Sequence, residues 1–102
     1  WYIYEKLNIV FEAFLILPIS YVLINSNLGT DTEIIEKIKE MMLAQDDVKL
    51  ELQGVYGVYD IIVKLSSDDN AKLRSIVTND IRKIENVQST LTMMVIEQQE
   101  KS

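Results

Sequence analysis

Cysteine and histidine are both missing from this chain of 102 residues, which also has only three glycines and one proline. Without those two residue types the chain can hold neither a Ser-His-Asp nor a Cys-His catalytic system, and it has no thiol redox centre. A zinc site of the His/Cys type and an axial His or Cys ligand for haem are excluded as well. We therefore expect neither a metal nor another cofactor.

Positive charge is also scarce. Ten Lys and Arg residues stand against 16 Asp and Glu residues, so the formal net charge is −6. Only Arg74 and Arg82 are arginines, and the basic residues are scattered singly along the chain. A DNA-binding surface needs clustered positive charge to displace counterions from the phosphates. The charge balance predicts that the isolated chain does not bind nucleic acid directly.

The first 18 residues (WYIYEKLNIVFEAFLILP) are the part of the chain richest in aromatic and aliphatic residues. A membrane span would have to cover residues 7–24 and would include Glu12 and Pro18, and no small-residue cleavage site of a secretory signal follows. We favour an added helix or strand that ends at Pro18. Its apolar residues at helical spacing are Ile3, Leu7, Val10, Phe11, Phe14 and Leu15. We expect no membrane association, and the lack of cysteine is compatible with a cytoplasmic location.

A strand and a helix are predicted next. Residues 20–25 (SYVLIN) are apolar and β-branched, and they lead into a turn at Gly29. The helix is expected to begin with a capping box, in which the Thr30 hydroxyl accepts the Glu33 amide hydrogen and the Glu33 side chain reaches back. Residues 45–47 (QDD) should end it. Its apolar side is formed by Ile34, Ile35, Ile38, Met41 and Met42.

A hairpin follows the first helix. Apolar and polar residues alternate over residues 48–56 (VKLELQGVY), which predicts a half-buried strand with Gly54 as a bulge or a point of close approach. Gly57 and Val58 are expected to form a tight turn, and residues 59–65 (YDIIVKL) predict the second arm.

The last third of the chain predicts a second helix and a final strand. Residues 66–70 (SSDDN), with Asp68 and Asp69, are expected to cap the helix, and residues 85–86 to end it. Residues 87–97 predict a strand. The inner face of the helix is assigned to Leu73, Ile76, Val77, Ile81 and Ile84.

The predicted order is strand, helix, hairpin, helix, strand. This is an α+β, ferredoxin-like βαββαβ arrangement, with a four-stranded antiparallel sheet and both helices on one face. The predicted strands carry apolar side chains on both faces of the sheet, because apolar residues follow one another directly, for example Ile61 and Ile62 or Met93 and Met94. The uncovered sheet face is therefore expected to be an interface, and the protein to be at least a dimer.

Two segments resemble the effector-binding domain of Lrp/AsnC transcription regulators, the RAM domain. They are residues 57–64 (GVYDIIVK) at the hairpin and residues 87–92 (VQSTLT) entering the last strand. The resemblance covers residues 20–99, and it divides the chain into an apolar extension (1–18), the RAM domain (19–99) and a tail (100–102). Residues 85–87 (ENV) depart from the small residue or glycine that usually precedes this valine.

The resemblance implies a dimeric α/β barrel, in which two sheets pack face to face and the dimers join into higher oligomers. Small effectors, typically amino acids, bind between dimers in this family and adjust assembly and hence DNA binding. Family members usually carry an N-terminal helix-turn-helix domain, and residues 1–18 are too short and too acidic or apolar to form one. The sequence therefore looks like a stand-alone form of the module that acts in transcription regulation.

The resemblance also implies that six residues of this sequence contact the effector, because they match positions that do so in the family. They are Gly57, Tyr59 and Asp60 at the hairpin, and Thr90, Thr92 and Met93 in the last strand. Asp60 suits an ammonium group, and the threonine hydroxyls suit a carboxylate. Met93 could contact the effector's side chain. The structural alternatives are that Asp60 only stabilises its turn, that Gly57 only supplies a positive φ, and that the threonines are ordinary strand residues.

Two other functions compete with effector binding. Dimeric barrels of this fold also include small monooxygenases, but these usually rely on histidine, bound haem or polar groups inside the barrel, so we expect no enzyme here. The second alternative is a non-binding oligomerisation or adaptor module that co-assembles with full-length Lrp-like regulators. In an adaptor, Asp60→Ala would leave amino-acid binding unchanged because there would be none to lose.

Overall fold

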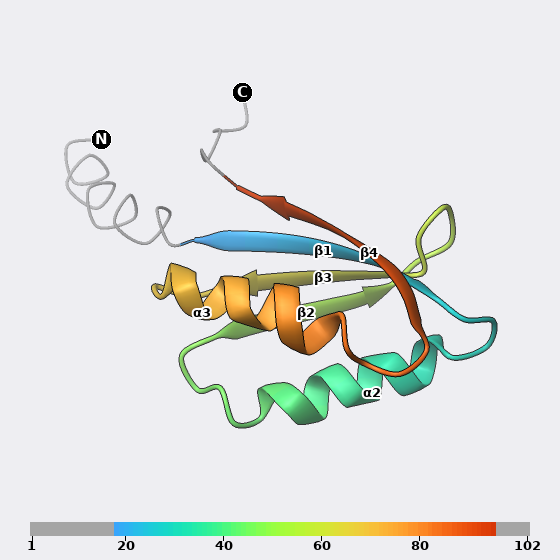
Figure 1. The fold of residues 1–102 in the computed structure, drawn as a ribbon, viewed down its shortest axis with the longest axis horizontal. Helices are drawn as coiled ribbons and strands as arrows, with labels where there is room; N and C mark the ends of the chain where they lie inside the picture. Colours follow the sequence, from blue (N-terminus) through green and yellow to red (C-terminus); the bar gives the residue numbers. More distant parts are fainter. Residues whose placement is uncertain (1–17, 96–102) are drawn as a thin grey trace, which may run out of the picture.

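The computed structural model describes residues 18–95, so the added helix or strand expected to end at Pro18 lies outside the described part. The elements are β1 (Ile19–Ser26), α2 (Asp31–Met42), β2 (Lys49–Gly54), β3 (Ile61–Ser66), α3 (Asn70–Ser75), the π-helix η1 (Ile76–Ile81) and β4 (Val87–Met94). The four strands form one antiparallel sheet in the order β2-β3-β1-β4, with both helical segments on one side of it (Figure 1). The predicted ferredoxin-like βαββαβ fold is confirmed.

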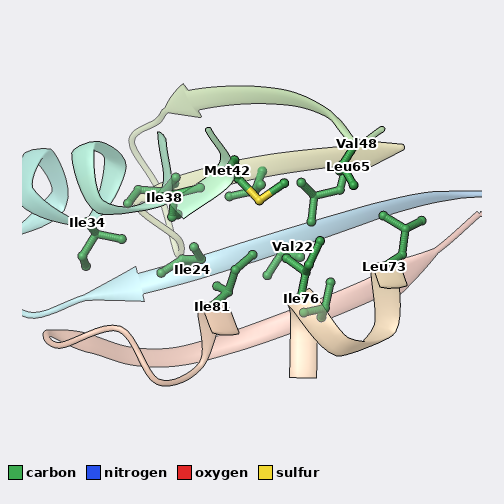
Figure 2. Packing of buried hydrophobic residues seen from close by; sticks show 13 residues of the cluster. Val22, Ile24, Ile34, Ile38, Met42, Val48, Leu65, Leu73, Ile76 and Ile81 are labelled. Carbon is green, nitrogen blue, oxygen red and sulfur yellow. The ribbon is translucent and has the colours of Figure 1, made fainter. Parts of the chain in front are cut away.

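The core lies between the sheet and the helices. In β1 every second residue is buried, namely Ser20, Val22 and Ile24, because successive side chains of a strand point to opposite faces. The buried hydrophobic residues of β1, α2, β3, α3 and η1, together with Val48 before β2, form one cluster (Figure 2). It consists of Val22, Ile24, Ile34, Ile38, Met42, Val48, Ile61, Val63, Leu65, Leu73, Ile76, Val77 and Ile81. Both predicted apolar helix faces are confirmed, since their remaining members, Ile35, Met41 and Ile84, pack against this cluster.

The second helix begins as predicted, but it changes type along its length. Asp69 is its N-cap and accepts a hydrogen bond of 3.0 Å from the Lys72 amide, so Asp69 rather than Asp68 caps the helix. The α-helix continues to Ser75, and a π-helical segment then runs to Ile81. The apolar spacing alone did not predict this change.

The predicted capping box of the first helix is wrong. The helix begins at Asp31, directly after Thr30, but the Thr30 hydroxyl donates to the Asn27 carbonyl at 2.7 Å and caps nothing. The same carbonyl accepts the Thr30 amide at 3.1 Å, so the preceding turn holds this side chain away from the helix. The Glu33 carboxylate accepts instead from the Asn86 side-chain amide at 3.4 Å.

Two expectations about the hairpin are also wrong. Gly54 pairs with Ile61 in an unbroken register, and a Cβ atom there would meet only the Ile35 Cδ1 atom at 4.0 Å, so Gly54 is neither a bulge nor a close approach. The connection between the strands is a loop of residues 55–60 rather than a tight turn at Gly57 and Val58. The Val55 amide closes it by donating to the Asp60 carbonyl at 2.9 Å.

A register shift occurs in β1, between Asn25 and Ser26, where the strand pairs with β4. The strand β4 ends at Met94 rather than continuing through residue 95 as predicted, while residues 96 and 97 lie outside the described part. Just before β4, Asn86 adopts a positive φ of 75°. Asparagine tolerates this left-handed conformation better than most residues, which explains how the chain makes the turn without the glycine or small residue usual there.

One ion pair joins the segment after α2 to the start of the second helix. The Lys72 ammonium donates to both carboxylate oxygens of Asp47, at 2.8 and 2.9 Å. The hydrogen bond from Lys72 lowers the pKa of Asp47, and the same bond raises the pKa of Lys72. The pair therefore links the connection between α2 and β2 to the helix α3.

A buried hydroxyl in β1 allows a direct stability test. Ser20 is 0% exposed, and its Oγ atom has no hydrogen-bond partner among the described residues. An unsatisfied buried polar atom destabilises a fold, so Ser20→Ala should raise the free energy of unfolding by about 1 kcal/mol. Urea denaturation of both chains measures this difference. A clear loss of stability in the alanine variant would contradict the expectation, and Ser89→Ala, at an exposed position of β4, is the control.

Candidate ligand-binding site

Asp60 stands at the end of the loop between β2 and β3 and is fixed by three hydrogen bonds to two residues of β1. Its amide donates to the Ile24 carbonyl at 2.9 Å, and its carboxylate atom Oδ2 accepts from the Ser26 amide at 2.8 Å and the Ser26 hydroxyl at 3.1 Å. The carboxylate therefore holds the end of β1 rather than only its own turn. Both bonds from Ser26 end on Oδ2, and Oδ1 accepts no hydrogen bond from the described residues.

The loop before Asp60 is open. Gly57 has a φ of +145°, and a Cβ atom there would meet nothing within 4 Å, so the conformation rather than crowding favours glycine. The structure thus confirms the positive φ considered from sequence. Tyr59 is half-buried, whereas Tyr56 and Val58 are exposed by 106% and 82%. The loop therefore presents apolar side chains to its surroundings on either side of the glycine.

The three predicted positions in β4 point to two different faces of the sheet. Thr90 pairs with Ile24 and Thr92 with Val22, so both threonines lie on the face that carries the helices. Met93 pairs with Tyr21 on the opposite, open face and is 46% exposed. Within one chain the six predicted residues thus occupy three places: the end of the sheet, the helix side of β4, and the open face.

The two threonines line a groove between the second helix and β4, which we call the β4 groove. Its volume is about 380 Å³. Its lining residues are Arg74, Val77, Thr78, Arg82, Thr90, Leu91, Thr92 and Met94. Both arginines of the chain line this groove, and none of the acidic residues within the described range 18–95 does.

Sequence reasoning noted the two arginines but did not place them in a site. Arg74, Thr78 and Arg82 are spaced by four residues, and four residues of an α-helix overshoot a full turn by about 40°. Residues at this spacing therefore share one side of the helix, and the wider turns of η1 (Ile76–Ile81) bring the three closer to one line along it. The Thr78 hydroxyl donates to the Arg74 carbonyl at 2.7 Å across this junction. The four-residue spacing was the available signal, but the π-helix was not foreseen.

The open face of the sheet has an apolar centre, which we call the open face patch. Its members are Tyr21, Leu23, Ile62, Leu91 and Met93. Leu91 and Met93 are exposed by 44% and 46%, unusually high values for large hydrophobic side chains in a sheet. Charges lie toward the β2 side, where Lys64 approaches Glu51 at 3.5 Å and stands 5.9 Å from the centre of the Tyr21 ring.

The part of the chain that the structure describes has neither a metal-binding cluster nor a membrane-spanning helix. No cluster of three or more carboxylates there could hold a metal ion. No helix among the same residues is long and apolar enough to cross a membrane.

Comparison with known proteins connects these observations. The family model of the Lrp/AsnC ligand binding domain matches residues 21–102. Among solved structures, FFRP-DM1 is 35% identical, with a TM-score of 0.62 and coverage of 78% of this chain and 99% of that chain. Hypothetical protein PHS023 from Pyrococcus horikoshii is 34% identical, with a TM-score of 0.61 and coverage of 79% and 92%.

A more distant structure is similar in fold alone. The transcriptional regulator NMB0573 from Neisseria meningitidis, solved as a complex with L-Met, is 12% identical with a TM-score of 0.61. The match covers 89% of this chain and 56% of that chain. A search of curated proteins found no match. The family model covers most of the chain, and two structures above 30% identity are matched over nearly their whole length, so this chain belongs to the family of Lrp/AsnC ligand binding domains.

Proposed function

We propose that this domain binds an amino acid as its effector and acts in transcription regulation through the assembly of several copies. The observation that carries the proposal is the fixed position of Asp60. Two hydrogen bonds from Ser26 orient its carboxylate beside an open loop, and they leave one oxygen for an incoming group. A carboxylate held in this way suits the ammonium group of an amino acid. The family's ligand-binding role supports the proposal, as does the distant regulator solved with L-Met.

The remaining parts of the site would come from a second copy. Asp60 and Thr90 lie on opposite sides of β1. The Ile24 carbonyl accepts a hydrogen bond from the Asp60 amide on one side of this strand, and Ile24 pairs with Thr90 of β4 on the other side. One chain therefore does not bring the predicted residues around a single ligand. A cleft between copies can combine the loop of one with Thr90, Thr92 or Met93 of another. The open face patch is the surface on which we expect the first pair of copies to meet.

The mechanism is linkage between binding and assembly. A ligand lodged between copies stabilises the assembly that forms its cleft by RT ln(1 + [L]/Kd) per site, which is about 2.7 kcal/mol when the ligand is at 100 times its Kd. In this proposal the protein works in the cytoplasm without catalysis, and any effect on DNA passes through a partner that binds DNA. The partner's response would then follow the amino-acid concentration.

A thermal-shift screen against the twenty amino acids, with mass measurement of the assembly, tests this function. We expect one or a few amino acids to raise the melting temperature and change the assembled mass. Asp60→Asn should reduce the affinity by about tenfold or more, because it removes the charge that faces the ammonium while an amide oxygen can still accept from Ser26. Asp68→Asn is the control, since it makes the same charge change at an exposed position before α3.

Two results would contradict the effector function. One is the absence of any shift or mass change with all twenty amino acids. The other is equal binding by the Asp60→Asn and Asp68→Asn variants.

The adaptor function remains the second candidate, and one observation favours it. The Asp60 carboxylate already accepts two hydrogen bonds inside its own chain, so it has a structural role without any ligand. An adaptor would co-assemble with full-length Lrp-like regulators whether or not an amino acid is present. Native mass spectrometry of the mixed proteins with and without the amino acids separates the two functions, because only the effector function predicts a ligand-dependent change.

A further inference from the structure

We propose that the β4 groove is a binding site for a small organic acid with a short apolar chain. The site is formed within a single chain on the helix side of β4; it shares Thr90 and Thr92 with the proposed effector site but does not include Asp60, on which that site depends. The inference therefore does not rest on the proposed function. Three features of the groove support it: the charge, the hydrogen-bond donors and the apolar wall.

The charge of the groove is opposite to that of the chain. The formal net charge is −6, yet Arg74 and Arg82 line the groove and no carboxylate of the part of the chain that the structure describes does so. Within residues 18–95 the ion pairs use Lys39, Lys64 and Lys72, so neither arginine is neutralised by a described acid. The planar guanidinium group presents several donors in a fixed fork that matches a carboxylate. Two such groups on one wall favour an anionic ligand.

The strand supplies donors on the other wall. β4 is an edge strand, and the Val95 amide donates to the Ile19 carbonyl at 2.9 Å, so the amides of residues 89, 91, 93 and 95 point toward β1. By the same alternation, the amides of Thr90, Thr92 and Met94 point away from β1. Both threonines line the groove as well. A carboxylate between the arginines and this edge would find neutral donors opposite the charged ones.

The groove also has an apolar part of limited size. Val77 is only 3% exposed and forms part of the wall, and Met94 is 37% exposed at the other side. The volume of about 380 Å³ is at the small end of the range of roughly 300–1,000 Å³ typical of ligand pockets. Such a space suits an acid with a branched chain of a few carbons better than a nucleotide or a peptide. The π-helix η1, to which Val77 and Thr78 of the groove belong, is a type of distortion often found at functional sites.

Titration of the full chain with 3-methylbutanoate, followed by amide NMR at matched ionic strength, tests this site. We expect saturable shifts at Thr78, Thr90 and Thr92. The neutral 3-methylbutanamide, which has the same shape, should produce none of them. Acetate should bind more weakly, because it lacks the apolar chain. Equal responses to 3-methylbutanoate and its amide, or no saturable shift with the acid, would overturn the proposal, and equal affinities for acetate and 3-methylbutanoate would overturn its apolar part.

Variants of the two arginines provide a second test of the groove. Arg74→Gln and Arg82→Gln should each weaken binding of 3-methylbutanoate by about tenfold or more, since each removes a charged donor. Arg82→Lys keeps the charge without the fork and should be intermediate. Lys83→Gln removes one positive charge next to Arg82 but outside the groove, and it should bind like the unmodified chain. If all four variants bind alike, the arginines do not form the site.

The two proposals fail in different ways. Asp60→Asn should leave 3-methylbutanoate binding unchanged, because Asp60 does not line the groove. Binding of 3-methylbutanoate without any amino-acid response would support the groove and contradict the effector function. The reverse result would contradict the groove alone.

Discussion

An Ile24→Ala variant should lose about 3–5 kcal/mol of unfolding free energy. Ile24 is 0% exposed in the central part of the sheet, where β1 is flanked by β3 and β4. Its side chain belongs to the single cluster between the sheet and the helices, and Figure 2 shows it among side chains from both layers. Truncation removes apolar contacts on the helix side and leaves a cavity that rigid strands cannot close.

Urea denaturation at a fixed protein concentration measures this loss, because assembly adds to apparent stability by mass action. For a domain of this size, a loss of 3 kcal/mol corresponds to a fall in melting temperature of roughly 12–24 °C. Ile35→Ala is the matched control, since Ile35 is only partly buried at the edge of the same cluster. The Ile35 variant should lose clearly less. A loss below about 1 kcal/mol for Ile24→Ala would show that this position is not part of a close-packed core.

Leu23→Glu should convert the assembled protein into a folded monomer. Leu23 lies on the open face patch, where it pairs with Ile62 on one side and Leu91 on the other. In a face-to-face dimer, the new carboxylate would be buried among apolar side chains with no partner, at a cost of about 3 kcal/mol or more. The dimer dissociation constant should therefore rise by about 100-fold or more. In the monomer the same carboxylate faces water, so the fold is retained.

Sedimentation over a range of concentrations checks the mass, and circular dichroism checks the fold. Gln53→Glu is the control, because Gln53 is exposed on the edge strand β2 and receives the same added charge on the same face of the sheet. It should alter the mass little. If Leu23→Glu has the same assembled mass as the unmodified chain, or if the unmodified chain is monomeric at every concentration, the open face patch is not the first interface.

Much of the fold could be predicted from the sequence because strong periodic patterns dominate it. The buried residues of α2, Ile34, Ile38 and Met42, recur at intervals of four, and this spacing is enough to identify the inner face of the helix. Details that depend on a single side chain were less predictable. The Thr30 hydroxyl could bond either to the first turn of the helix or to the preceding turn. It bonds to the preceding turn, because the hydrogen bond from the Thr30 amide to the Asn27 carbonyl places that carbonyl within reach of the hydroxyl.

The candidate site was predictable only in part, for a similar reason. Asp60 and Gly57 were found through the hairpin motif, and both have distinct local roles in the structure. Thr92 and Met93 were grouped although adjacent strand residues point to opposite faces, so the grouping could hold only across two copies. The arginines of the β4 groove were missed although residues four apart share one side of a helix, because the sequence did not show that this side faces β4.

The place of β1 in the sheet also affects how the protein can be made. The first strand in the chain order is central and pairs with the last one, so that Ser20 lies opposite Met94. A nascent chain that has not yet produced β4 exposes one side of β1, including the backbone groups that β4 will later occupy. Another nascent chain could pair with that free edge through its own β1. Ribosomes translating one message would then carry neighbouring chains with the same unprotected edge, and each chain stays at risk of aggregation until its last strand is released.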